Sequence, residues 1–182
     1  MDTILKSGAA NVQLVTGLFP NRQSAEAAYG GVTQRGYDSK DVDLVMSDDT
    51  RKHHFSGTTV GKETELGNKA AEGAGIGGAI GGTVGAIAAA VAAIGTSLVL
   101  PGLGLVIAGP LAAAVAGAGA GAASGGLIGA LVGWGMPEER VKEYEEGVKK
   151  GGILMGLRAR NPEDAEYFEQ NWKSNQGLNV YR

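Results

Sequence analysis

Between Glu72 and Glu138 the sequence contains no charged residue, although charged residues make up 19% of the whole chain. Residues 73–135 comprise 19 Gly, 18 Ala and 19 Val, Ile or Leu in 63 positions. All Asp, Glu, Lys and Arg lie outside this range. The chain is therefore a polar globular protein interrupted by a long apolar segment, and this interruption constrains the fold more than any other feature.

Glycine recurs at every fourth position in both halves of the apolar segment. On a helix, this spacing makes a groove without side chains, so that another helix can approach closely. Each Gly costs a helix in water roughly 0.8–1.0 kcal/mol relative to Ala, so close packing or a membrane must offset that cost. The sequence predicts a helix-packing interface that contains Gly73, Gly77, Gly81 and Gly85 in the first half and Gly117, Gly121, Gly125, Gly129 and Gly133 in the second.

A turn signal at Pro101-Gly102 divides the segment, and Pro110 suits the first position of a second helix. We expect one helical arm at about 73–98 and another at about 110–134, each roughly 37–39 Å long, which is enough to cross a hydrocarbon core of about 30 Å. Neither arm has a polar face, and a helix that is apolar all round is either buried on every side or in lipid. The hairpin should therefore meet a bilayer or other copies of the chain.

Trp134 lies where the apolar run meets a charged segment. An aromatic residue in that place can anchor a protein at a membrane interface. The alternative is that Trp134 packs against the rest of the protein, and the sequence favours neither.

Two β–α–β patterns flank the apolar segment. In the first, residues 12–19 and 41–47 favour strands on either side of a helix that Asn21 can cap. In the second, residues 152–159 favour a strand, and Asn161 and Pro162 favour the start of a helix that is followed by a last strand at 178–181. Together these units predict an α+β fold with a ferredoxin-like split βαβ sheet, in which the strands at 12–19 and 152–159 pair at the centre.

This interpretation divides the chain into five parts. They are a flexible tail at 1–11, the first half of the α+β domain at 12–47, a polar linker at 48–72, the glycine-zipper helical hairpin at 73–135, and a charged helix with the second half of the α+β domain at 136–182.

Composition and motifs argue against catalysis and against bound cofactors. The chain has no Cys and a net charge of −3, so it has neither cysteine-ligated metal sites nor a basic footprint for nucleic acid. His53 and His54 are adjacent and point apart, and the glycines at 73–78 lack the flanking strand and acidic residue of a dinucleotide loop. We expect no enzyme, no catalytic residue, no cofactor, no metal, no nucleic-acid partner and no small-molecule substrate.

Three segments of the sequence resemble bacterial general stress proteins of the heat-induced type. They are VTGLFPNRQSAEAAYGGVTQRGYDSKDVDLVM (15–46), LVLPGLGLVIAGPLAAAVAG (98–117) with the glycine-zipper hairpin, and GMPEERVKEYEEGVKKGGILMGLRA (135–159). The resemblance implies a stress-associated, non-enzymatic protein without an assigned substrate. It brings no catalytic residues to this chain.

These observations predict a stress-associated structural protein whose hairpin inserts in a membrane or drives homo-oligomerisation. The first eleven residues lack the features of a signal peptide, so we expect the protein in the cytoplasm or on the inner face of the cytoplasmic membrane. One alternative is a regulatory or ligand-binding ferredoxin-like domain tethered to a membrane. Another is a pore component, which the absence of a polar stripe on either arm disfavours.

Overall fold

A computed structural model describes residues 13–55, 97–100, 104–117, 126–133 and 135–182. The elements in this part of the chain are β1 (Gln13–Phe19), α1 (Arg22–Gln34), β2 (Val42–Ser47), α2 (Asp48–Phe55), β3 (Ser97–Leu100), β4 (Leu105–Ala108), α5 (Pro110–Gly117), α7 (Gly126–Gly133), α8 (Glu138–Lys149), β5 (Ile153–Ala159), α9 (Pro162–Ser174) and β6 (Leu178–Tyr181). The protein therefore mixes α and β structure, as the sequence predicts.

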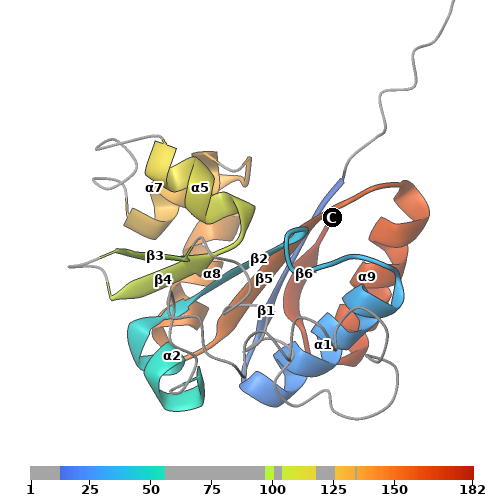
Figure 1. The fold of residues 1–182 in the computed structure, drawn as a ribbon, viewed down its shortest axis with the longest axis horizontal. Coiled ribbons are helices and arrows are strands. Elements are labelled where there is room, and N and C mark those ends of the chain that lie inside the picture. Colours follow the sequence, from blue (N-terminus) through green and yellow to red (C-terminus); the bar gives the residue numbers. More distant parts are fainter. Residues whose placement is uncertain (1–12, 56–96, 101–103, 118–125, 134) are drawn as a thin grey trace, which may run out of the picture.

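The strands form one antiparallel sheet in the order β3-β4-β2-β5-β1-β6 (Figure 1). β1 and β5 pair along their whole length, from Gln13 opposite Ala159 to Phe19 opposite Ile153. The predicted pairing of these two strands is confirmed. β5 lies between β1 and β2, so the two parts of the chain on either side of the apolar segment are joined in a single sheet.

The helices α1 and α9 begin at the Asn residues that the sequence marks as caps. The side chain of Asn21 accepts a hydrogen bond from the Ser24 amide at 2.9 Å, and that of Asn161 accepts one from the Asp164 amide at 2.7 Å. Each cap satisfies a backbone donor that the first turn leaves without an intrahelical partner. Pro162 follows directly as the first residue of α9.

Helix α1 continues through Gly30 and Gly31 without a break. A Cβ atom added at Gly31 would lie only 2.4 Å from Oδ1 of Asn171 on α9. The glycine thus leaves room for the Asn171 side chain against α1.

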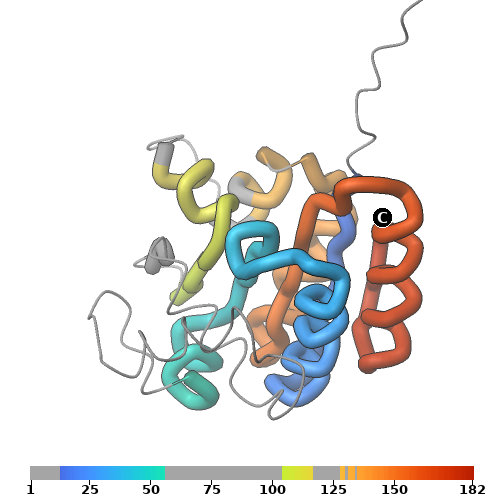
Figure 2. The backbone as a smooth tube through the Cα atoms, turned by 45° about the vertical axis from the view of Figure 1, so that its right-hand side comes forward, coloured from blue at the N-terminus to red at the C-terminus, as the bar shows by residue number. Residues whose placement is uncertain are grey.

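Alternate residues along β1, β2, β4 and β5 face two separate apolar cores. One core contains Val15, Phe19 and Met155 with the helices α1 and α9, including the buried Trp172. The opposite core holds Leu18, Val45, Ile107 and Leu154 from the sheet with Leu111, Leu131, Val141 and Tyr144 from α5, α7 and α8. The described part of the molecule therefore has three layers, with the sheet in the middle (Figures 1 and 2).

The expected helical hairpin over 73–135 is wrong for part of that range. Ser97–Leu100 and Leu105–Ala108, expected as the end of the first arm and the tip, are the strands β3 and β4, which extend the sheet beyond β2. Branched residues cluster there, and a short apolar run of this kind suits a strand as well as a helix. The remainder of the first arm, residues 73–96, lies outside the described residues.

The second expected arm, at 110–134, is described as two helices, α5 and α7, of eight residues each. Residues 118–125 between them lie outside the described part of the chain. Within the described ranges, no helix has both the length and the apolar character needed to cross a membrane.

The polar linker expected at 48–72 begins with a helix instead of a loop. α2 has Asp48 in its first turn, where a negative charge is favourable, and Lys52 in its last. The Thr50 amide donates to Oγ of Ser47 at 3.0 Å, and Phe55 is buried in the core beside α1. Residues 56–72 and the expected tail at 1–11 lie outside the described residues.

Candidate functional site

The helices α5 and α7 lie on one face of the sheet, and we call them together the Gly/Ala-rich layer. Leu111, Ala112 and Val115 on α5 and Leu131 on α7 point inward and are buried among the apolar side chains of that face. α5 is therefore folded against the protein's own sheet, and α7 is folded against α8 above the same core.

The outward side of the Gly/Ala-rich layer carries small apolar residues. Ala113, Ala114 and Ala116 are exposed on α5, as are Val132 and Gly133 on α7, and Val132 is 44% exposed. A Cβ atom added at Gly133 would have no neighbour within 4 Å. This face therefore presents no charge to its surroundings and leaves room for a close approach at the end of α7.

The structure places four of the residues that the sequence singles out. Pro110 is the first residue of α5, Gly117 is its last, and Gly129 and Gly133 lie four residues apart on α7. The predicted glycine interface stays a prediction at these positions. Gly73, Gly77, Gly81, Gly85, Gly121, Gly125, Pro101, Gly102 and Trp134 lie outside the described residues.

A buried carboxylate on the sheet caps the start of α5. Oδ1 of Asp43 on β2 accepts a hydrogen bond from the Leu111 amide at 2.5 Å, and Asp43 is only 4% exposed. Burial raises the pKa of this carboxyl to about 7, while the hydrogen bond from Leu111 and the positive charge of Arg158 act to lower it. Asp43 is thus a titratable group inside the contact between the sheet and the Gly/Ala-rich layer.

The turn that leads into α5 leaves no room for a side chain. Gly109 has a φ of +110°, and an added Cβ would lie 2.4 Å from the carbonyl oxygen of Val42 and 2.6 Å from Oδ1 of Asp43. Gly109 also accepts a hydrogen bond from the Ala112 amide at 3.0 Å. Only glycine combines this backbone conformation with such close packing on β2.

Helix α7 ends in a Schellman motif. Gly135 has a φ of +102° and its amide donates to the Val132 carbonyl at 2.9 Å, while the Met136 amide donates to the Leu131 carbonyl at 3.1 Å. Met136 and Leu131 are both buried in the core beneath the layer. The Gly/Ala-rich layer is therefore bounded at both ends by a glycine with positive φ, Gly109 before α5 and Gly135 after α7.

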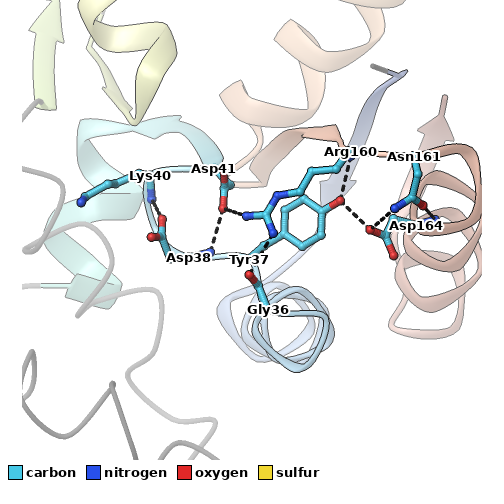
Figure 3. Close-up of polar contacts among 8 residues, drawn as sticks. All are labelled: Gly36, Tyr37, Asp38, Lys40, Asp41, Arg160, Asn161 and Asp164. Carbon is cyan, nitrogen blue, oxygen red and sulfur yellow. Dashed lines mark hydrogen bonds and ion pairs between the residues drawn. The ribbon is translucent and has the colours of Figure 1, made fainter. Parts of the chain in front are cut away.

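A second polar cluster joins the loop after α1 to the loop after β5 (Figure 3). The Tyr37 hydroxyl donates to Oδ2 of Asp164 at 2.8 Å and accepts from the Arg160 amide at 2.8 Å. The Arg160 guanidinium lies 4.0 Å from the centre of the Tyr37 ring and pairs with Asp41 at 2.8 Å. Burial raises the pKa of Tyr37, with a further contribution from Asp164. The hydrogen-bonding groups of this cluster are thus paired with one another. We call the cluster a joint, because it links the part of the chain before the apolar segment to the part after it.

A polar hollow of about 280 Å³ lies between the start of α1 and the end of α9. Several of its polar groups already serve the helix ends. Asn21 and Ser24 bond each other, Ser174 bonds the Gln170 carbonyl, and Asn175 bonds the Asn171 carbonyl. The hollow therefore offers a ligand few groups that are not engaged already.

The histidine pair His53-His54 lies on α2. The nearby Asp48 binds Arg51 at 2.8 Å and Lys52 at 2.6 Å. Among the described residues, no group of three or more His, Cys, Asp or Glu side chains is arranged to hold a metal ion.

Sequence reasoning missed both Asp43 and the Tyr37 cluster. The alternating pattern of β2 places Asp43 on the opposite side from Val42 and Leu44. An acidic residue inside an apolar strand is the sequence feature that could have marked Asp43 as a functional candidate. The partner amide on Leu111 is 68 residues away, and Tyr37 and Asp164 are 127 residues apart. Contacts at such separations need the topology to be known first.

Together, the antiparallel sheet and the helices on both of its faces define a mixed α/β protein, and the uncharged outward side of the Gly/Ala-rich layer lies on one of those faces. The chain has no match among protein-family models, curated proteins or solved structures.

Proposed function

We propose that this chain is a non-enzymatic, stress-associated structural protein that assembles into homo-oligomers through the outward side of the Gly/Ala-rich layer. The observation that carries the proposal is the composition of that side, where Ala113, Ala114, Ala116, Val132 and Gly133 are exposed. The association with stress rests on the resemblance to general stress proteins. The proposed location is the cytoplasm or the inner face of the cytoplasmic membrane.

The proposal includes a description of the fold as a ferredoxin-like split βαβ unit that the apolar segment extends. Its support is the strand order β2-β5-β1-β6, with α1 after β1, α9 after β5, and both helices packed on the same core. β4 and β3 add two strands beyond β2, and α5 and α7 join α8 on the face that an isolated unit would leave to solvent.

The physical case for self-assembly is the low cost of pairing two such faces. Burying a charge without a partner is strongly unfavourable, and no charged residue occurs between Glu72 and Glu138. Small residues let backbones approach, so that many weak van der Waals contacts form over a short distance. The open space at Gly133 is where a neighbouring backbone can come closest.

The first test introduces a charge at the centre of the proposed interface. Ala114→Glu should weaken assembly of the full chain at least about tenfold, because association would bury an unpaired carboxylate. Sedimentation velocity over a range of concentrations measures the effect. Gln23→Glu, which adds the same charge at an exposed position on α1, is the control and should leave assembly unchanged.

Two results would contradict the proposal. One is a monomer at every concentration of the wild-type chain, and the other is equal assembly of Ala114→Glu and the wild type. Flotation with lipid vesicles, run in parallel, distinguishes the alternative partner. Binding to vesicles by a chain that does not self-associate would assign the same face to a lipid bilayer.

A further inference from the structure

We propose that Asp43 is a latch that holds the Gly/Ala-rich layer on the sheet, and that opening this latch frees α5 and weakens self-assembly. The link to assembly rests on the function proposed above, whereas the link to α5 stands on the geometry alone.

The latch consists of one carboxylate and the first turn of α5. Asp43 reaches from β2 to the Leu111 amide, which is among the backbone donors that the start of a helix leaves unpaired. The carboxylate therefore meets both a hydrogen-bond donor and the positive end of the helix dipole. Beyond this point, the inward side of α5 contacts the sheet through apolar side chains only, namely those of Leu111, Ala112 and Val115.

The turn at Gly109 couples the position of α5 to that of Asp43. Its backbone lies so close to Val42 and Asp43 that a single added carbon would collide with both. A shift of α5 away from β2 must therefore break the hydrogen bond, and loss of the hydrogen bond removes the polar contact that fixes the first turn. Gly109 and Gly135, which bound the layer, both adopt conformations that only glycine accepts readily.

The charges around Asp43 determine how the latch responds to pH. Arg158 on β5 is the charged group that acts on it. On β5, the residue directly opposite Asp43 is Gly156, which has no side chain. The elements α5, α7 and β4 contain no titratable residue. α8 turns Val141, Tyr144 and Val148 toward the sheet, and burial raises the pKa of Tyr144, which keeps its phenol neutral.

The sign of the pH effect follows from the two states of the carboxyl. With the latch closed, Asp43 has a pKa of about 7, whereas a solvated Asp has the ordinary value of 3.8. The closed state therefore binds more protons than the open state between these values. Raising the pH across this range favours opening, by roughly tenfold per pH unit, and the effect levels off above the closed-state pKa.

Hydrogen exchange of the full chain tests the latch directly. Exchange at the amides of residues 111–117, corrected for the intrinsic rate at each pH, should speed up about tenfold per unit between pH 4.5 and 6.5 and then level off. Asp43→Asn keeps an oxygen acceptor for Leu111 but carries no charge, so its exchange should not depend on pH. Two results would overturn the latch. One is a corrected exchange rate in the wild type that does not change with pH, and the other is the same dependence of that rate on pH in Asp43→Asn as in the wild type.

Two further variants open the latch without titration. Asp43→Ala removes the acceptor, and Gly109→Ala forces the turn away from β2, so both should expose residues 111–117 to faster exchange while β1 and β5 stay protected. Asp48→Asn changes a carboxylate of α2 and is the matched control. If Asp43→Ala does not fold, the pH series on the wild type and Asp43→Asn still decides.

Sedimentation of the same samples separates the latch from the proposed function. Faster exchange together with a loss of oligomers supports both. Faster exchange with unchanged oligomers supports the latch and overturns assembly through this layer. Loss of oligomers in Asp43→Ala with unchanged exchange overturns the latch.

Discussion

At the scale of single residues, the structure depends on a few buried polar groups that connect distant parts of the chain. The hydroxyl of Tyr37 bridges Asp164 and the Arg160 amide, and the hydroxyl of Tyr144 donates to Oγ1 of Thr16 at 2.8 Å. Each of these hydrogen bonds joins residues more than 120 positions apart. Because a buried polar group without a partner is costly, such contacts favour one arrangement of the two parts over others.

Removing the Tyr37 hydroxyl should reveal how much the Tyr37 cluster contributes to the free energy of unfolding. Tyr37→Phe leaves the Arg160 amide without its acceptor and removes a donor from Asp164, so the free energy of unfolding should fall by about 1–3 kcal/mol. Urea unfolding followed by Trp fluorescence measures the change. The control is Tyr167→Phe, the same chemical change on a half-buried ring that lies 4.1 Å from the Arg35 guanidinium. Equal stability of the two variants would argue against the joint.

At the scale of elements, the helices and the strands at the two ends of the chain follow closely from local sequence. Asn21, Asn161 and Pro162 mark the helix starts, and the alternation of β2 and the apolar run of β5 mark strands within one residue or two of their observed ends. The segment at 97–108 differs from the expected hairpin because Gly and Pro around a short run of Leu, Val and Ile fit a helix end and a strand equally well. Within this segment β4 pairs with β2, which lies about 60 residues earlier, and this pairing favours the strand conformation over the helix.

The approach of α1 to α9 gives a prediction at this scale. Ala normally stabilises a helix interior relative to Gly by about 1 kcal/mol, but Gly31→Ala should give less than this gain because the added carbon overlaps the side-chain amide of Asn171, which must turn away. Thermal unfolding of the variant tests this. Gly133→Ala, measured at a concentration at which the chain is monomeric, should be neutral or slightly stabilising because within one chain nothing lies within 4 Å of the added carbon. A Gly31→Ala variant that gains the full helix-propensity difference would show that the Asn171 side chain moves at no cost.

At the scale of the whole molecule, the apolar segment belongs to the sheet domain at least in part. β3 and β4 widen the sheet, α5 packs on β2, β3 and β4, and α7 packs on α8, which covers the rest of the same face. The sequence predicted two β–α–β units and their central pairing, but it treated the segment between them as a separate hairpin. Composition alone could not show that a small sheet has a free apolar face for such a segment to cover.

Deleting residues 73–135 behind a short Gly/Ser linker tests this dependence. The deletion removes two strands and the helices that pack on β2 and α8, so apolar side chains of β2 and α8 lose part of their cover. The product should therefore bind a hydrophobic dye and unfold at a lower temperature than the full chain. Deleting residues 1–11 instead should change neither property. A deletion product that unfolds cooperatively and binds no dye would show that the sheet domain is complete without the segment.

The position of β5 also determines when the protein can fold during its synthesis. β5 lies between β1 and β2 and pairs with both, so the sheet cannot join these two strands until residue 159 has left the ribosome. The whole uncharged stretch before Glu138 emerges earlier than that. The nascent chain therefore passes through a period in which its most apolar part has no completed sheet to cover, and its yield should depend on the chaperones that meet it then.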